Sequence, residues 1–161
     1  MSTTDRNQFV DHRARALAKV FLMARNSIMP IEIMAEFSDL DLLARILPEE
    51  DVYEKLFGVI IKATTTPLPT EESAKTYLNQ WARARKKDHI FPFPILVLVF
   101  SMLTDDGYYA WRIAPDLTDG TPTLKVNTAF ETQRTNKRGL DVLTRSLEEW
   151  YSQQYDILIP K

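Results

Sequence analysis

The sequence predicts a single α+β domain in which helices flank a mixed β-sheet. Segments with helical periodicity lie between groups of strand-like segments instead of following every strand. Residues 95–100 are almost continuously apolar, which is typical of a strand covered on both faces. The Asp-Asp-Gly sequence at residues 105–107 favours a hairpin turn. Because 161 residues suffice for one hydrophobic core, we expect one domain over residues 1–161.

The N-terminal part of the chain predicts one helix and three strands. Apolar side chains recur every three or four residues over residues 6–25, which indicates an amphipathic helix. Pro30 should stop it. Apolar side chains then alternate with Glu32, Met34 and Glu36 over residues 31–36, which predicts a short edge or half-buried strand with the glutamates on one side. Residues 40–46 and 57–63 are rich in β-forming side chains and should pair as a hairpin across a polar loop.

The rest of the chain predicts a second helix, a second hairpin and a third helix. Thr70 is a typical N-cap and is followed by two acidic residues, so a helix should begin there. The apolar strand at residues 95–100 should pair with an aromatic-rich strand at residues 108–113. Residues 124–126 are a candidate short strand, and helical periodicity returns over residues 140–154.

Composition excludes several classes of function. With no cysteine, the chain has no disulfide framework, thiolate zinc site or cysteine nucleophile. The first residues do not resemble a signal peptide, and the longest apolar run is too short to cross a bilayer, so we expect a cytoplasmic protein without membrane contact. The formal net charge of −2 gives no general excess of cations for binding nucleic acid, although it permits a locally basic cleft.

Two charged residues lie on the apolar strands of the first predicted hairpin. Alternate side chains of a strand share a face, so Asp41 and Lys62 can converge if their strands pair. An aspartate is a suitable ligand for Mg²⁺, and a lysine can orient a nucleophile and offset developing negative charge. The same spacing also fits an ion pair with a purely structural role.

The local sequences around these two residues carry a family resemblance. Phe-Ser-Asp-Leu-Asp-Leu-Leu at residues 37–43 and Phe-Gly-Val-Ile-Ile-Lys-Ala-Thr at residues 57–64 resemble the PD-(D/E)XK nuclease superfamily, and most closely a small bacterial branch of it. The Pro-led strand from Pro94 and the later strand that contains Trp111 resemble the same branch. The resemblance covers the chain from Arg6 to about Tyr151 and implies a restriction-endonuclease-like αβββαβ core.

The resemblance assigns roles to individual residues. It implies that Asp41 is catalytic and binds Mg²⁺, and that Lys62 is the catalytic lysine. Ile60 stands where the superfamily has its second acid or a glutamine, and isoleucine cannot bind a metal. Three acids could supply the missing ligand: Asp11, Glu32 and Glu36. We take Glu36 as the second metal ligand.

Two clusters of cations are candidate contacts for nucleic acid. They are Arg83, Arg85, Lys86 and Lys87 at the end of the second helix, and Arg134, Lys137 and Arg138 before the third. The first cluster could equally complement the helix dipole. The second should lie in a loop, where it is freer to meet a partner.

The resemblance implies a DNA-associated, nuclease-like protein of bacterial defence or mobile-element type, and the missing acid predicts impaired catalysis. The alternative is a catalytically inactive module that binds nucleic acid or a protein partner. A third possibility is an immunity or inhibitory protein whose acidic loop imitates a phosphate backbone, through Glu49, Glu50, Asp51 and Glu54. The predicted edge strand also allows a homodimer.

Overall fold

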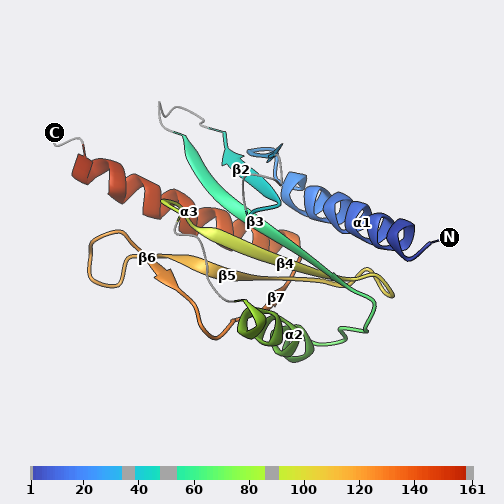
Figure 1. Cartoon of the computed structure of the whole chain (residues 1–161). Helices are drawn as coiled ribbons and strands as arrows, with labels where there is room; N and C mark the ends of the chain where they lie inside the picture. The colour runs from blue at the N-terminus through green and yellow to red at the C-terminus, as the bar shows by residue number, and fades with distance from the viewer. Residues whose placement is uncertain (1, 34–38, 48–53, 86–90, 159–161) are drawn as a thin grey trace.

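A single seven-stranded mixed sheet with three helices organises the part of the chain that the structure describes (Figure 1). The structure is a computed structural model and describes residues 2–33, 39–47, 54–85 and 91–158. Along the chain its elements are α1 (Thr3–Met23), β1 (Ile28–Glu32), β2 (Leu42–Ile46), β3 (Lys55–Thr64), α2 (Glu71–Ala84), β4 (Ile95–Ser101), β5 (Gly107–Asp116), β6 (Thr123–Val126), β7 (Gln133–Arg134) and α3 (Lys137–Leu158). The predicted α+β class is confirmed, and the order of elements through β4 is αβββαβ.

The strands lie in the spatial order β1-β2-β3-β4-β5-β6, with β7 paired to β5. β1, β2 and β3 form an antiparallel meander, so the first predicted hairpin is confirmed. α2 connects β3 to β4, and these two strands form the only parallel pair among the described strands. β4 and β5 are the second predicted hairpin, and every residue of β4 is buried, as its continuous apolar sequence predicts.

The two faces of the sheet carry separate hydrophobic cores under different helices. α1 and α3 pack on one face and α2 on the other (Figure 1). Side chains alternate along β3, so Val59 and Ile61 contact the core under α1 and α3, whereas Ile60 belongs to the core under α2. This alternation determines which helix each polar side chain of β3 can reach.

The structure corrects several predicted boundaries. α1 ends at Met23, before the predicted end, and β1 contains Pro30 instead of following it. A proline is tolerated there because β1 pairs only with β2 among the described strands, so no second neighbour needs its missing N–H. The third helix is longer than predicted, and β7 was missed because a two-residue polar strand has no periodic pattern. None of the described helices has the length and apolar composition needed to span a bilayer.

Candidate functional site

A hollow of about 230 Å³ lies between α1 and the C-terminal half of β3, where β2 has not yet begun to pair. Its walls come from α1, the residue before β2 and β3. They are Asp11, Ala14, Arg15, Asp41, Ile61, Lys62 and Ala63. Both residues that the sequence singled out as catalytic therefore line one hollow.

Asp41 extends the pairing of β2 with β3 through its side chain. Its N–H donates to the carbonyl of Val59 at 2.9 Å, and its Oδ2 accepts a hydrogen bond from the N–H of Ile61 at 2.7 Å. The carboxylate thus satisfies a backbone donor of β3 beyond the point where β2 ends. This charge-assisted bond fixes the orientation of the carboxylate.

Arg15 on α1 holds the other side of the same carboxylate. Its Nη2 pairs with Oδ1 of Asp41 at 3.1 Å, and its Nη1 donates to the backbone carbonyl of Asp41 at 3.1 Å. The two side chains are 28% and 29% exposed, so water screens this ion pair less than one on the open surface. Both oxygens of Asp41 are therefore engaged by donors from the protein itself.

Lys62 lines the hollow, but its ammonium is held by a residue on the opposite face of the sheet. Its Nζ lies 5.2 Å from the centroid of the Trp81 ring on α2, a cation–π contact. Within the described residues, Lys62 makes no ion pair and no hydrogen bond through its side chain. The predicted convergence of Asp41 and Lys62 is therefore wrong. Both residues line the hollow, but the Asp41 carboxylate pairs with α1 and the Lys62 ammonium contacts α2 on the other face of the sheet.

The other acids proposed as metal ligands are distributed unevenly around the hollow. Asp11 lines it from α1, one helical turn before Arg15. Glu32 instead accepts a hydrogen bond from Lys19, which lowers the pKa of its carboxyl group. Glu36 lies outside the described residues. Ile60 is 4% exposed and packs in the core under α2, so it has a packing role.

The described residues at the hollow offer few free carboxylates for the predicted Mg²⁺. Mg²⁺ requires near-octahedral oxygen coordination, usually with carboxylates that are free to bind it. At the hollow, the carboxylate of Asp41 is already paired with a guanidinium, and Asp11 is the only other acid that lines it. Among the described residues, no group of three or more acids, histidines or cysteines is arranged to hold a metal ion.

The first predicted basic cluster is described only in part. Arg83 is exposed near the end of α2, whereas Lys86 and Lys87 lie outside the described residues. Arg85 is the C-cap of α2, and its guanidinium lies 4.9 Å from the centroid of the Trp81 ring. It also forms an ion pair with Asp39, at 3.8 Å. Arg85 and Lys62 therefore both make cation–π contacts with the indole ring of Trp81.

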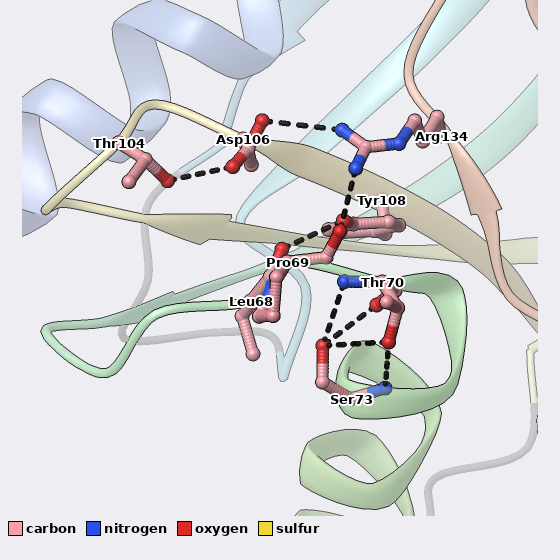
Figure 2. A network of polar contacts seen from close by, with 8 residues as sticks. All are labelled: Leu68, Pro69, Thr70, Ser73, Thr104, Asp106, Tyr108 and Arg134. Atoms are coloured by element: carbon pink, nitrogen blue, oxygen red, sulfur yellow. Dashed lines mark hydrogen bonds and ion pairs between the residues drawn. The ribbon is translucent and has the colours of Figure 1, made fainter.

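In the second basic cluster, the side chain of Arg134 makes several contacts within the protein (Figure 2). Its guanidinium donates to Asp106 at 3.1 Å and to the carbonyl of Pro69 at 2.7 Å, and it lies over the ring of Tyr108. The Tyr108 hydroxyl in turn donates to the carbonyl of Leu68 at 2.6 Å. These contacts link β7 and β5 to the segment before α2, which gives Arg134 a structural role.

Lys137 and Arg138 lie exposed in the first turn of α3. Cations at the N-terminus of a helix oppose its dipole, so the dipole does not explain their presence there. They remain candidate contacts for an anionic partner.

Sequence reasoning missed two residues that define the site, Arg15 and Trp81. Arg15 follows Asp11 by four positions on α1, which places both on one helix face, but only the pairing of β2 with β3 brings Asp41 to that face. Trp81 belongs to the predicted apolar stripe of α2, and its sequence position gives no sign that two cations contact its ring.

Comparisons with family models, curated proteins and solved structures find no match to this chain.

Proposed function

We propose that this chain is a nuclease-like protein that associates with DNA and no longer cleaves it efficiently. The observation that carries the proposal is the hollow beside β3, which is lined by the aspartate and the lysine of the resembled motif, while Ile60 at the position of the second acid is buried in the core under α2. The αβββαβ order of elements supports a nuclease origin. The contacts of Asp41 support the loss of cleavage.

The loss of activity follows from the electrostatics of the hollow. Metal-assisted phosphodiester cleavage requires a cation that polarises the phosphate and lowers the pKa of a bound water. Here the guanidinium of Arg15 neutralises Asp41, and Ile60 offers no ligand. A guanidinium can pair with a phosphate, but it cannot replace a metal ion in activating water.

Local positive charge supports association with DNA. Lys62 has no carboxylate partner in the described part of the chain, and Arg83, Lys137 and Arg138 are exposed. Contacts with phosphate groups dominate non-specific affinity for DNA and depend on local cations, so a formal net charge of −2 does not prevent them.

The proposal is tested by incubating supercoiled plasmid with the protein and Mg²⁺ or Mn²⁺, with Asp41→Ala and Lys62→Ala variants alongside. We expect no cleavage by any of the three proteins, and retention of a labelled duplex at low salt. Cleavage by the wild type that both variants lose would show an active enzyme. Failure of the wild type to retain the duplex would exclude DNA association.

An exposed apolar stripe on α1 favours a second candidate, a protein-interaction module or homodimer. Phe9, Val20 and Met23 are 60%, 70% and 58% exposed, and their spacings are close to whole helical turns, so they share one face of α1. Light scattering after size-exclusion chromatography tests the homodimer, which a purely monomeric protein would exclude. Asp substitution of Val20 should dissociate a dimer that uses this stripe.

A further inference from the structure

We propose that Lys62 and Arg85, both held on the ring of Trp81, form a phosphate-contacting centre for the backbone of a nucleic acid. We call these three residues the Trp81 cation cluster. The proposal rests on the proposed association with DNA and names the surface that would carry it. It also gives Lys62 a binding role that needs no metal.

The cluster is assembled from two parts of the fold. Lys62 comes from β3 and Arg85 from the C-cap of α2, and Trp81 one turn earlier in α2 receives both cations. The ring centroid lies 5.2 Å from Nζ of Lys62 and 4.9 Å from Cζ of Arg85. Cation–π contacts of this kind hold the two charges in place without neutralising them.

The two cations of the cluster differ in their carboxylate partners. Asp39 pairs with Arg85 at 3.8 Å, and Lys62 has no carboxylate partner in the described part of the chain. Arg85 has a side chain only 21% exposed, and Lys62 is half-buried, so water screens the repulsion between the two cations incompletely. An anion bound beside these cations would reduce that repulsion.

Positive charge continues beyond the cluster on the same face of the sheet. Phe130 packs against Trp81 with ring centroids 6.2 Å apart, and the guanidinium of Arg112 on β5 lies 5.8 Å from the centroid of Phe130. Cations thus follow a row of aromatic rings from β3 across α2 to β5. A row of this kind suits the repeated phosphates of a nucleic acid better than a single small anion.

The cluster is tested by the salt dependence of binding to a fluorescein-labelled DNA duplex. The variants are Lys62→Gln, Arg85→Gln and the double substitution. Lys125→Gln and Arg6→Gln remove one exposed cation each outside the cluster and serve as matched controls. Thermal melting establishes that every variant is folded.

Each cluster variant should weaken binding several-fold at low salt and reduce the slope of log K against log salt by about 1, because one phosphate contact is lost. The double variant should reduce the slope by about 2 if both contacts are made. The two controls should bind with the affinity and slope of the wild type. Duplex should also change the tryptophan fluorescence of the wild type more than that of Trp81→Phe.

The outcomes separate the cluster from the proposed function. If the wild type binds and the cluster variants keep its affinity and slope, the cluster is not the contact surface, while DNA association stands. If the wild type does not bind, the proposed function fails. Displacement of the duplex by millimolar inorganic phosphate at constant ionic strength would show a site for free anions and overturn the assignment to a nucleic-acid backbone.

Discussion

At the scale of single residues, Asp41 makes contacts that its local sequence does not predict. The sequence predicts a metal ligand, whereas the structure engages both carboxylate oxygens with Arg15 and the N–H of Ile61. Ile60, two positions before Lys62, packs in the core under α2. A local sequence cannot reveal Arg15 as the partner, since the contact spans 26 positions and needs the folded sheet edge.

Replacement of Asp41 by alanine should destabilise the protein by about 1–3 kcal/mol, because the N–H of Ile61 and the guanidinium of Arg15 lose their acceptor. Urea unfolding at neutral pH measures the loss. Asp11→Ala is the matched control, because Asp11 lines the same hollow and makes no hydrogen bond or ion pair with the described residues. Equal stability of the two variants would contradict the role given to Asp41.

Replacement of Arg15 by glutamate should create a cation site, because Asp11, the new glutamate and Asp41 would line one hollow. Mn²⁺ should then raise the melting temperature of Arg15→Glu and leave that of the wild type unchanged, since a ligand that binds only the folded state stabilises it. Arg13→Glu controls for the added acid, because Arg13 pairs with Asp105 away from the hollow. If Mn²⁺ leaves the melting temperature of Arg15→Glu unchanged, the claim that Arg15 takes the place of a metal ion beside Asp41 is refuted.

At the scale of elements, periodicity predicted the helices and the central strands, and failed where the pattern was short or interrupted. β4 was predictable because both its faces are buried, and α2 because Thr70 marks its start. Pro30 was interpreted as a break, although an edge strand can accommodate it. Gln133 and Arg134 form β7 because they pair with Tyr108 and Tyr109 of β5, a tertiary contact that the local sequence does not indicate.

The start of α2 depends on a reciprocal pair of hydrogen bonds. The Thr70 hydroxyl accepts from the N–H of Ser73 at 3.2 Å, and the Ser73 hydroxyl accepts from the N–H of Thr70 at 3.1 Å (Figure 2). Thr70→Ala should therefore cost about 1 kcal/mol in chemical denaturation. Thr76→Ala, within the same helix, should be neutral or slightly stabilising because alanine favours the helical state. A Thr70→Ala variant as stable as the wild type would show that the Thr70 cap does not stabilise α2.

The hydroxyl of Tyr151 on α3 hydrogen-bonds to the backbone of β3, so the free energy of unfolding should decrease at alkaline pH. Its hydroxyl donates to the carbonyl of Leu56 and accepts from the N–H of Leu56 at 3.1 Å, and burial raises the pKa of Tyr151 to about 12. Because the neutral phenol is favoured in the folded state, its contribution is complete below pH 10.0 and is lost as pH rises towards about 12.

The Tyr151→Phe variant tests this dependence in two measurements. It should be less stable than the wild type at neutral pH, by about 1–3 kcal/mol, because Leu56 loses its partner. The difference from the wild type should narrow above pH 10.0, as measured by urea unfolding across that range. A difference that stays constant with pH would show that Tyr151 does not titrate as described.

At the scale of the whole molecule, the sheet separates the two residues of the predicted motif. The Asp41 carboxylate faces the layer of α1, and the Lys62 ammonium engages Trp81 in the layer of α2, although both line the hollow at the edge of β3. The sequence could predict the strands that bring them together, since those strands have clear β patterns. It could not predict their partners, because these come from helices on opposite faces.

This division supports the proposal that the protein contacts nucleic acid through its own cations, without a bound metal. The direct measurement is the affinity for a labelled DNA duplex in EDTA and in Mg²⁺ at matched ionic strength. We predict equal affinity in both, with binding that weakens steadily as salt rises. Binding that appears only with Mg²⁺ would contradict the claim and restore Asp41 as a metal ligand.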